Sequence, residues 1–463
     1  MNSISIIGTG YVGLVTGTCL SEFGLQVICM DSDAQKIQDL ARGKIPIHEP
    51  GLPALISKNV ASGRLRFITD VAEAVSSSTV IFIAVHTPPG EDGSADLQYV
   101  LSAAESIALH MNDYKVVVNK STVPIGTGRR VQKIIRQTLE HRGLALDFDV
   151  VSNPEFLREG SAIRDFMHPD RVVIGSDNEK SREAIRDIYN VLYLIDTPFI
   201  FTSIETAELV KYASNAFLAT KIAFINEVAN LCDMADADIR DIAKAMGLDG
   251  RIGKFFLHPG PGFGGSCLPK DTRALARIGQ ELGAPMSIVE SVVRANEHQR
   301  RHMVNKIEAR LPDLRGKVIG VLGLAFKQGT DDIRESSAIQ IIFKLVEKGA
   351  RVRVYDPFAM ENAGKFAFSC LAGAESEQFD MARQGLSDAV DFQIIYCLDE
   401  YDAARGADAI VILTEWNQFR HMDLAKIASL MRGNFFFDFR NIYEPADITK
   451  FDLIYEGIGR SKR

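Results

Sequence analysis

Residues 3–13 of this 463-residue chain read Ser-Ile-Ser-Ile-Ile-Gly-Thr-Gly-Tyr-Val-Gly, an apolar run that passes directly into three spaced glycines. The run predicts a buried β-strand, and the pattern beyond it predicts a helix. Gly8, Gly10 and Gly13 have the spacing of a dinucleotide fingerprint, in which glycines allow a tight turn and let the backbone approach a pyrophosphate at a helix N-terminus. The stretch therefore predicts a doubly wound α/β domain with a dinucleotide site.

Asp31 strengthens this prediction. It ends a second strand-like run, residues 26–30, at the spacing expected for the acid that binds the 2′-hydroxyl of the ribose. A carboxylate there repels a 2′-phosphate, so the sequence favours NAD over NADP. A glycine-rich turn without a ligand is the alternative, and the order of strand, turn, helix and acid argues against it.

The rest of the chain alternates between two kinds of pattern. Apolar strand-like runs recur at residues 80–85 and 116–118, and again at 318–322, 351–355, 409–413 and 435–437. Helical periodicity without prolines fills residues 204–246, and a second helical stretch covers residues 285–311. Continuous apolar strands of this kind suit a parallel sheet that is covered on both faces.

The predicted fold class is therefore α/β, with two doubly wound Rossmann-like domains joined by a central helical domain that contains a long helix. The predicted domains are an NAD-binding domain at residues 1–203, a helical domain at 204–312 and a second Rossmann-like domain at 313–463. Residues 356–407 have a blurred pattern, and we expect an irregular or inserted segment there.

Composition excludes several classes of protein. Acidic residues (60) outnumber basic ones (52), and the net charge of -8 argues against binding to nucleic acid or to an anionic membrane. The chain has no recognisable signal peptide or membrane-spanning run, so we expect a cytoplasmic location. Its six cysteines are scattered without metal-ligand or disulfide spacing, so no metal site is expected.

One of those cysteines, Cys267, stands apart from the others. It lies in Gly-Phe-Gly-Gly-Ser-Cys-Leu-Pro-Lys-Asp, residues 262–271, where Pro269 suits the first turn of a helix. The helix N-terminus and Lys270 would favour the thiolate, and Asp271 shares its helix face. A thiolate beside a nicotinamide could hold an aldehyde covalently for a second oxidation. A buried structural thiol is the alternative.

Other candidate groups come from separate parts of the chain. Lys211 and Asn215 lie four residues apart on the predicted long helix and could stabilise an oxyanion, although a solvated helix edge is the commoner meaning of such a pair. Glu155 and Glu159 are candidate general bases, with helix-start acids as the alternative. Thr122 follows a strand end, where this fold places its ligands.

The second Rossmann-like domain has weaker signals. Gly320 and Gly323 lack the full fingerprint spacing, so a second NAD site is not expected there. Lys327 and Arg334 lie just beyond the end of the strand predicted at 318–322, where anionic ligands bind in such sheets. Solvated surface charge is the alternative for each of them.

The motifs at residues 8–13, 120–124, 153–159 and 264–271, with Gly-Leu-Ala-Phe-Lys at 323–327 and Asp-Ile-Arg-Glu-Ser at 332–336, resemble those of the nucleotide-sugar dehydrogenase family over nearly the whole chain. The resemblance implies a four-electron oxidation of UDP-glucose to UDP-glucuronate, a polysaccharide precursor. Two NAD molecules act in succession, and Cys267 carries a thiohemiacetal and then a thioester. The predicted long helix is apolar over much of its circumference and needs partners on several sides, so we expect a homodimer or higher homo-oligomer formed through the central helix.

The resemblance implies the following site residues, none of them for a metal. Its catalytic groups are Cys267, Lys211, Asn215, Asp271, Glu155, Glu159 and Thr122. NAD contacts fall on Gly8, Gly10, Tyr11, Val12, Gly13, Asp31, Lys36, Thr87, Thr122, Glu159, Lys270 and Arg334. UDP-sugar contacts fall on Glu155, Phe156, Leu157, Arg158, Glu159, Lys211, Asn215, Arg251, Phe256, Leu257, His258, Pro259, Gly260, Gly264 and Lys327, with Arg251 reaching in from a neighbouring subunit.

Other nucleotide-sugar dehydrogenases of the family are the nearest alternatives. Enzymes for UDP-N-acetyl sugars typically have a histidine before the cysteine and lack the Pro-Lys-Asp that follows it here, whereas this chain has Ser266. GDP-mannose dehydrogenase shares the cysteine segment, but His-Pro-Gly-Pro-Gly-Phe at 258–263 resembles the UDP-glucose branch more closely. The segment 358–401 is longer than the family pattern. A catalytically silent nucleotide-binding scaffold is the alternative from another class.

Overall fold

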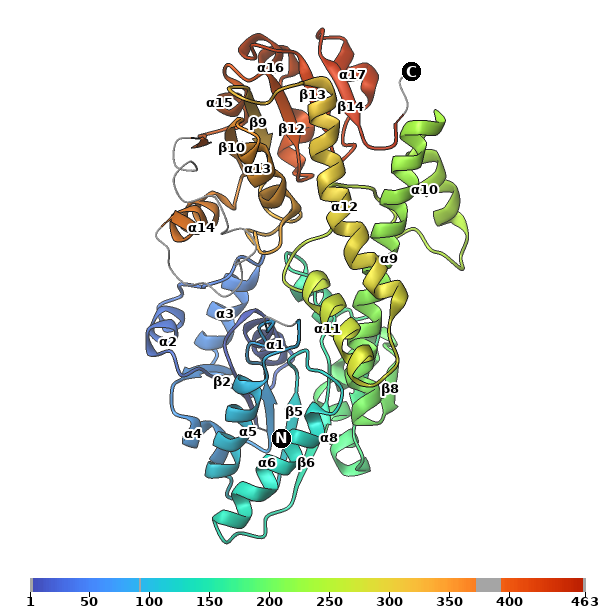
Figure 1. Ribbon diagram of the computed structural model, residues 1–463. Coiled ribbons are helices and arrows are strands. Elements are labelled where there is room, and N and C mark those ends of the chain that lie inside the picture. The colour runs from blue at the N-terminus through green and yellow to red at the C-terminus, as the bar shows by residue number, and fades with distance from the viewer. Residues whose placement is uncertain (1–2, 91–92, 372–392, 461–463) are drawn as a thin grey trace. The chain divides into compact units, whose positions relative to one another are not determined.

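The computed structural model describes residues 3–90, 93–371 and 393–460. The chain divides into two compact units, Met1–Ser214 and Asn215–Arg463, each described by itself below. Figure 1 follows the chain from blue at the N-terminus to red at the C-terminus. This division gives two units, so the three predicted domains and their boundaries stay predictions.

The first unit is built on one eight-stranded sheet in the order β3-β2-β1-β4-β5-β6-β7-β8. Neighbouring strands are parallel except for β6 and β7, which are antiparallel. The strands are β1 (Ile4–Ile7), β2 (Val27–Met30), β3 (Leu65–Ile68), β4 (Val80–Ile83), β5 (Lys115–Asn119), β6 (Phe148–Ser152), β7 (Val172–Gly175) and β8 (Phe199–Thr202). Its helices are α1 (Tyr11–Glu22), α2 (Ala34–Ala41), α3 (Leu52–Ala61), α4 (Val71–Ser76), α5 (Gln98–His110), α6 (Thr127–His141), α7 (Ala162–Met167), α8 (Glu179–Ile188) and the 3-10 helix η1 (Asn190–Ile195).

Both faces of this sheet are buried, which explains why its central strands are continuously apolar. Along β4, Val80 and Phe82 join one hydrophobic cluster, while Ile81 and Ile83 join another. Successive side chains of a strand point to opposite faces, so a sheet covered on both faces needs apolar residues at every position. The strand order 3-2-1-4-5-6 is the doubly wound arrangement that the fingerprint predicted.

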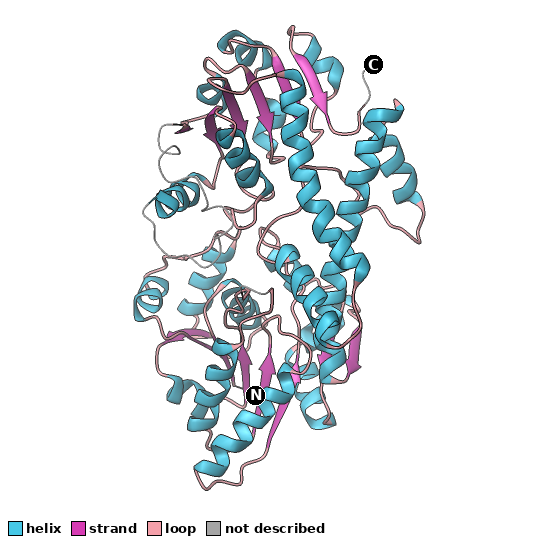
Figure 2. Ribbon diagram, viewed as in Figure 1, coloured by secondary structure: helices cyan, strands magenta, loops and turns pink. Residues whose placement is uncertain are grey.

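The second unit contains a six-stranded, wholly parallel sheet in the order β11-β10-β9-β12-β13-β14. Its strands are β9 (Val318–Leu322), β10 (Arg351–Tyr355), β11 (Ile394–Tyr396), β12 (Ala409–Ile412), β13 (Phe435–Asp438) and β14 (Ile454–Gly457). Figure 2 shows these strands between helices. The predicted fold class, two Rossmann-like domains joined by a helical domain, is confirmed.

The second unit also contains most of the chain's longer helices. The longest, α9 (Ile204–Ala235), begins in the first unit and continues into the second. The others are α10 (Ile239–Leu248), α11 (Leu268–Glu281), α12 (Ser287–Arg310), α13 (Ser337–Glu347), α14 (Met360–Leu371), α15 (Glu400–Ala404), α16 (Leu424–Leu430), α17 (Pro445–Thr449) and the 3-10 helix η2 (Asn417–His421).

One expectation about local structure is wrong in part. We expected an irregular or inserted segment over residues 356–407, yet the regular elements α14, β11 and α15 lie within it. The three residues of β11 are too few for a periodic signal, and α15 has only five. Residues 372–392 of this segment lie outside the described residues.

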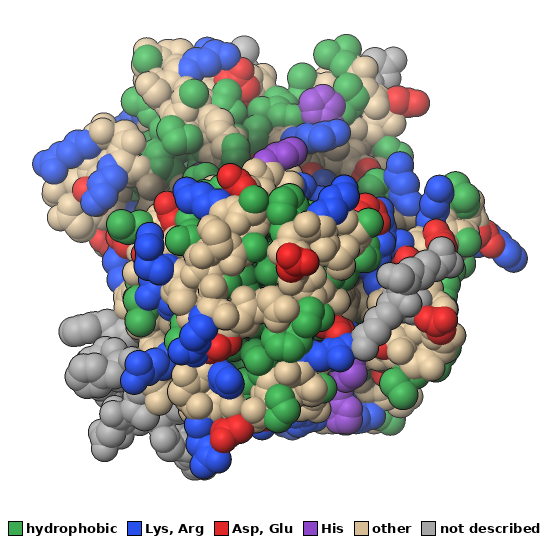
Figure 3. All heavy atoms as spheres, turned by 90° about the horizontal axis from the view of Figure 1, so that it is seen from above, with side chains coloured by type: hydrophobic (Ala, Val, Ile, Leu, Met, Phe, Trp, Pro, Cys, Tyr) green, Lys and Arg blue, Asp and Glu red, His purple; other side chains and the backbone are tan. Residues whose placement is uncertain are grey.

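The surface carries charges of both signs. On the face drawn in Figure 3, Lys and Arg side chains are interspersed with Asp and Glu side chains. Within residues 3–90, 93–371 and 393–460, no helix combines the length and apolar character needed to cross a bilayer.

Candidate active site

Glycines shape the turn between β1 and α1. Gly8 has a φ of +98°, and a Cβ added to it would lie 2.6 Å from the Ala84 carbonyl oxygen. A Cβ added to Gly13 would lie 1.9 Å from the Gly8 carbonyl oxygen. Any side chain at either position would push α1 away from the sheet, so the glycines bring the start of α1 close to the strand ends.

Asp31 directly follows β2, and its carboxylate lies against this turn. Its Oδ2 atom accepts hydrogen bonds from the Thr9 backbone N–H at 2.8 Å, the Thr9 hydroxyl at 2.7 Å and the Lys36 ammonium at 3.0 Å. Burial alone would raise the pKa of Asp31, but these hydrogen bonds outweigh burial and hold the pKa below its ordinary value. Asp31 is therefore an ionised acid fixed beside the glycine turn.

The atoms of this turn fit a dinucleotide. Gly10 precedes α1, and no side chain caps the N–H groups of the first turn, where Tyr11 and Val12 lie. Free N–H groups at a helix N-terminus bind phosphate. Oδ1 of Asp31 accepts one N–H, from Asp33 at 3.1 Å, which leaves a lone pair for a ribose hydroxyl. Thr87 follows β4 at the same sheet edge.

The second sheet also places a glycine after one strand and an aspartate after the next, but protein donors occupy this aspartate. Gly323 follows β9 with a φ of +99°, and Asp356 follows β10. Oδ2 of Asp356 accepts N–H groups from Leu324 at 2.7 Å, Ala325 at 3.0 Å and the Trp416 indole at 3.0 Å. Its Oδ1 accepts two more N–H groups, both at 2.9 Å. Five protein donors already occupy this carboxylate, so it is not available to a ribose.

Glu155 and Lys211 form a buried ion pair in the first unit. Lys211 Nζ lies 2.8 Å from Glu155 Oε1, and their side chains are only 4% and 5% exposed. The other oxygen of Glu155 accepts the Leu157 N–H at 2.5 Å. Lys211 Nζ also lies 5.4 Å from the centre of the Phe156 ring. The Arg171 guanidinium lies 3.5 Å from the centre of the same ring. Two predicted substrate residues, Phe156 and Leu157, thus contact the predicted catalytic pair.

Electrostatics keep Glu155 of this pair ionised. Burial would raise the pKa of Glu155, but attraction and hydrogen bonding from Lys211, with the Leu157 N–H, hold it below its ordinary value. A second lysine, Lys120, is buried nearby and donates to Asn153 Oδ1 at 3.0 Å and to Tyr189 Oη at 3.2 Å. Burial lowers the pKa of Lys120 to about 8, and Glu155 partly offsets this effect.

The remaining candidates of this loop have other partners. The Arg158 side chain pairs with Asp165 at 2.5 Å, and Glu159 beside it is half-buried. The hydroxyl of Tyr11 donates to the buried Glu49 carboxylate, which also accepts the Gly160 N–H at 2.8 Å. Through these hydrogen bonds, Glu49 joins the fingerprint turn to the loop that contains Glu159. Thr122 is half-buried in the loop between β5 and α6.

Cys267 lies at the N-terminus of α11 in the second unit. It is the N-cap residue, Pro269 occupies the first turn, and the Cys267 carbonyl accepts the Asp271 N–H at 2.9 Å. Cys267 is half-buried, whereas the other four cysteines with described surroundings are buried. Its sulfur lies 3.6 Å from the Ser266 hydroxyl. The positive end of a helix dipole favours a thiolate at this position.

Asp271 connects this cysteine to the long helix. Its buried carboxylate accepts the Asn215 side-chain N–H at 2.6 Å through Oδ2, and Lys270 Nζ lies 2.9 Å from Oδ1. Asn215 comes from α9 and Asp271 from the first turn of α11. Three candidates from two distant parts of the sequence therefore meet around one carboxylate.

Close packing fixes the loop before Cys267. A Cβ on Gly264 would lie 2.4 Å from the Glu335 carbonyl oxygen, and Gly265, at a φ of +84°, is packed against the Phe326 ring. Asn296 and Arg300 bind the backbone of Phe263, because Asn296 both accepts its N–H at 2.8 Å and donates to its carbonyl, to which Arg300 also donates at 3.0 Å. The cysteine thus follows a rigid segment.

The predicted UDP-sugar loop is held by amide side chains. The N–H of Gly260 donates to Asn226 Oδ1 at 2.8 Å, and its carbonyl accepts the Gln299 amide at 2.9 Å. Of its neighbours, Leu257 and Pro259 are buried, His258 is exposed and Phe256 has a φ of +64°.

Three charged candidates lie outside these clusters. Arg251 is almost fully exposed and pairs with Asp249 at 2.6 Å. Lys327 Nζ lies 5.7 Å from the centre of the Phe326 ring. The Arg334 side chain pairs with Asp332 at 2.8 Å, and its carbonyl accepts the Gly265 N–H at 3.0 Å. Arg334 therefore borders the loop of Cys267.

The candidates form two sets, one in each unit. The fingerprint, Asp31, Lys36, Thr122 and the Glu155–Lys211 pair belong to the first unit, and Asn215, Cys267, Lys270 and Asp271 to the second. Sequence patterns did not identify Glu49, Tyr189, Asn296 or Arg300 as members of these sets. Their partners lie far away in the sequence, and no local spacing signals such contacts.

Models of three domains of one family match the chain. They describe the UDP-glucose/GDP-mannose dehydrogenase family: its NAD binding domain matches residues 2–193, its central domain residues 205–298 and its UDP binding domain residues 320–445. The NAD binding domain includes the turn at Gly8 and Asp31, and the central domain includes Cys267.

Full-length relatives agree with the domain matches. The UDP-glucose 6-dehydrogenase of Rhizobium meliloti strain 1021 is 49% identical over 461 residues, which cover 99% of each protein. The UDP-glucose 6-dehydrogenase TuaD of Bacillus subtilis strain 168 is 45% identical over 460 residues, covering 99% of this chain and 94% of that protein. A UDP-glucose dehydrogenase structure from the hyperthermophilic archaeon Pyrobaculum islandicum matches with a TM-score of 0.86 at 39% identity, covering 99% of this chain and 98% of the other.

Replacing Lys211 by Met should destabilise the protein by about 3–5 kcal/mol at pH 7, because it leaves the Glu155 carboxylate buried without its partner. Denaturation in urea measures the change. The double variant K211M/E155Q should recover most of the loss. Lys58→Met, which removes the exposed partner of Glu22, serves as the control and should change stability by about 1 kcal/mol or less. Equal stability of K211M and the wild type would contradict the role of the ion pair.

Proposed function

Because the chain belongs to the UDP-glucose/GDP-mannose dehydrogenase family, we propose that it is an NAD-dependent UDP-glucose 6-dehydrogenase. It oxidises the C6 alcohol of UDP-glucose to the carboxylate of UDP-glucuronate. The observation that carries the proposal is the half-buried Cys267 at a helix N-terminus, next to the buried Asp271 carboxylate and its Asn215 partner. The names of the full-length relatives support the choice of substrate.

The first step removes a hydride from C6 and a proton from the C6 hydroxyl group, and gives an aldehyde. NAD, when bound, accepts one hydride in each oxidation, so each sugar uses two NAD molecules. Gly8, Gly10 and Asp31 hold it, and Lys36 secures Asp31. Thr122 and Asp271 assist removal of the alcohol proton. Lys211 and Asn215 stabilise the negative charge that develops on oxygen, as a buried ammonium and an amide donor can.

The second step depends on the cysteine. The thiolate of Cys267 attacks the aldehyde carbon, a carbon–sulfur bond forms, and the oxygen takes up a proton to give a thiohemiacetal. Loss of the second hydride and of the hydroxyl proton gives a thioester. Water then attacks the carbonyl carbon, the carbon–sulfur bond breaks, and the acid and the Cys267 thiolate are released.

Glu155 and Glu159 have different proposed roles. Glu155 is ionised and bound to Lys211, so it fixes the ammonium rather than exchanging its own proton. We assign activation of the hydrolytic water to Glu159, which is half-buried in the same loop.

The same family offers other substrates. Ser266 before the cysteine and Pro269 after it argue against UDP-N-acetyl sugars. GDP-mannose is the closest competitor, because its dehydrogenases share the cysteine segment. A catalytically silent scaffold is the least favoured alternative, since both sets of polar partners are intact in the structure.

We further propose a homodimer that forms through α9. Phe217, Phe224 and Leu231 repeat every seven residues along this helix and are 65%, 51% and 65% exposed. Seven residues are nearly two helical turns, so the three side chains form one apolar stripe. A cytoplasmic location is supported by the cysteines, since none of the five with described surroundings forms a disulfide bond. UDP-glucuronate made there would supply polysaccharide synthesis.

With UDP-glucose and excess NAD, we expect two NADH formed for each sugar consumed. NADH absorbance and chromatography of the nucleotide sugars measure the ratio. GDP-mannose and UDP-N-acetyl sugars serve as the comparison panel and should react at least about 100-fold more slowly. A ratio of one would rule out the four-electron mechanism, and faster turnover of GDP-mannose would assign the chain to that substrate.

Replacing Cys267 by Ala should abolish UDP-glucuronate formation while leaving the affinity for both nucleotides within about twofold, because the thiol acts only after the first oxidation. Mass spectrometry of the product and calorimetric titration measure the two quantities. The buried Cys397→Ala is the matched control and should keep full acid formation. Retained acid formation by C267A would eliminate the thioester.

Replacing Phe224 by Glu should convert the dimer to a monomer, since it places a charge in the apolar stripe of α9. Sedimentation velocity measures the mass in solution. Tyr99→Glu, at an aromatic residue of α5 with 55% exposure, is the control and should remain dimeric. An unchanged mass for F224E would exclude this face as the interface.

A further inference from the structure

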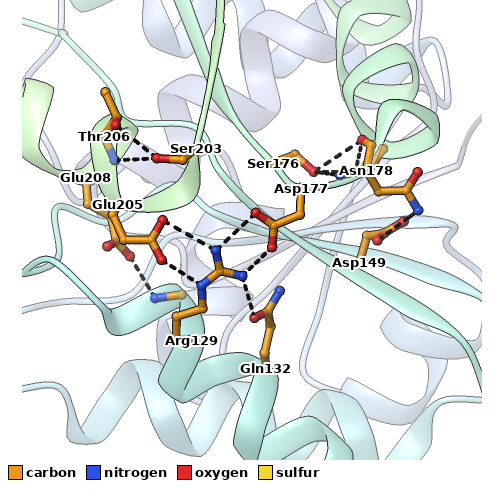
Figure 4. A network of polar contacts seen from close by, with 12 residues as sticks. Arg129, Gln132, Asp149, Ser176, Asp177, Asn178, Ser203, Glu205, Thr206 and Glu208 are labelled. Atoms are coloured by element: carbon orange, nitrogen blue, oxygen red, sulfur yellow. Dashed lines mark hydrogen bonds and ion pairs between the residues drawn. The ribbon is translucent and has the colours of Figure 1, made fainter.

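Glu208 is a buried acid that sequence patterns did not select. It lies on α9 one turn before Lys211, and its side chain points toward the start of α6 in Figure 4. The residue is only 2% exposed. Its Oε2 atom accepts the Gly126 N–H at 2.7 Å, and its Oε1 atom accepts the Gly128 N–H at 2.7 Å. One carboxylate therefore binds two free N–H groups of the first turn of α6.

The two helices approach closely at this contact. A Cβ added to Gly128 would lie 2.4 Å from Ile204 Cγ2, on the first turn of α9, and 3.3 Å from Glu208 Oε1. Gly126 caps α6 with a φ of +88°. The glycines therefore let the backbone of α6 meet α9 at a distance that the glutamate side chain spans.

This contact is one end of the loop that carries Thr122. At the other end, the Lys120 N–H donates to the Ile83 carbonyl at 2.9 Å, and the Ser121 hydroxyl donates to the Val85 carbonyl at 2.7 Å. The sheet thus anchors the start of the loop, and Glu208 anchors its end to α9. Thr122 lies between the two anchors.

We propose that Glu208 is a positioning residue for the reaction: its ionised carboxylate joins α6 to α9 and so fixes the Thr122 loop relative to Lys211. The inference rests on the proposed function, which assigns roles to Thr122 and Lys211. Glu208 itself touches the two backbone N–H groups and acts through them.

The ionisation state of Glu208 decides whether both bonds form. An ionised carboxylate accepts from both N–H groups, whereas a protonated one presents a hydroxyl to one of them. Burial raises the pKa of Glu208 to about 7, and the hydrogen bonds from Gly128 and Gly126 oppose this effect only in part.

Neighbouring charges modulate this equilibrium. Glu205, one turn earlier on α9, raises the pKa of Glu208, and Arg129 on α6 lowers it. Figure 4 shows Arg129 between the carboxylates of Glu205 and Asp177, which it binds on either side. Lys211, on the next turn of α9, is paired with Glu155. With these neighbours, Glu208 accepts both N–H groups, those of Gly126 and Gly128, above pH 7 and only one of them below it. We call this pair of hydrogen bonds the clamp.

Stability and activity should therefore respond to pH in opposite directions. The folded pKa lies above the ordinary value of 4.5, so the stabilisation by the protonated form is present below pH 4.5 and is lost as the pH rises through about 7. The Tm of the wild type relative to that of Glu208→Gln should fall between pH 5 and 7 and stay constant above pH 8. Activity instead depends on the ionised form.

Kinetics of Glu208→Gln test the positioning role. Its amide accepts one N–H but presents its own N–H group to the other, so one bond is lost at every pH. At pH 8 we expect kcat to fall about 10- to 100-fold with little change in either KM, since a small misplacement of catalytic groups has effects of this size. At pH 6 the wild type also loses the clamp, so the ratio of the two kcat values should approach one.

Two further variants complete the experiment. Glu205→Gln changes an acid of the same network and should keep the wild-type kcat at pH 8, while its pH profile should move to lower pH because Glu205 raises the pKa of Glu208. Glu208→Asp keeps the charge but cannot span both N–H groups, so it should lose activity at pH 8 and retain a pH-dependent limb that E208Q lacks.

A wild-type kcat for E208Q at pH 8 would overturn the positioning role, as would a deficit that does not change with pH or a relative Tm that rises between pH 5 and 7. A wild type that forms no NADH from UDP-glucose would instead overturn the proposed function, and the positioning role would fall with it.

Discussion

The ion pair between Glu155 and Lys211 is the interaction on which the first set of site residues depends. Removing two charges from water costs several kcal/mol for each ion, and only close geometry with further hydrogen bonds offsets this cost. Here the 2.8 Å contact, the Leu157 N–H and the Phe156 ring supply those interactions. Since the pair is stable only in this arrangement, it fixes the loop of residues 155–159 against α9. The geometry that the proposed catalysis requires is therefore also the geometry that keeps the buried charges paired.

The second set obeys the same rule. Asp271 is buried and lies between an amide and an ammonium, so its two oxygens point in fixed directions from the start of α11. Cys267 begins that helix, and its backbone is held by the Asp271 N–H. Because these buried polar groups hold one another in fixed positions, less conformational entropy is lost when a substrate is bound in a reactive position beside them. The position of the Cys267 sulfur is therefore fixed by contacts of Asp271 and of the Cys267 backbone, rather than by contacts of the sulfur itself.

Local sequence patterns predicted the parts of the structure that depend on near neighbours. The fingerprint turn, β9, β10, the long α9 and the helix that begins after Cys267 all follow from periodicity, glycine or proline within a few residues. The contact of Glu208 with Gly128 joins residues 80 positions apart, and that of Tyr11 with Gly160 joins residues 149 positions apart. No short pattern encodes such contacts. An acid within a helix has the same local signature whether it faces water or the N-terminus of another helix.

The two sheets show why fold alone does not decide function. Each places a glycine after its first strand and an aspartate after the next, and each aspartate accepts the N–H that follows the glycine. Asp31 is 12% exposed and retains a lone pair, whereas Asp356 is 1% exposed and accepts five N–H groups, including that of Trp416. The aspartate of the first sheet is therefore available to a ribose hydroxyl, whereas that of the second organises its own loop. The two aspartates differ in the number of protein donors around them: in the second sheet, an indole and the N–H groups of a tight turn take the acceptor sites that a cofactor hydroxyl would need.

A nucleotide at the second sheet must then be recognised by groups other than Asp356, which is consistent with a domain that binds UDP rather than a second NAD.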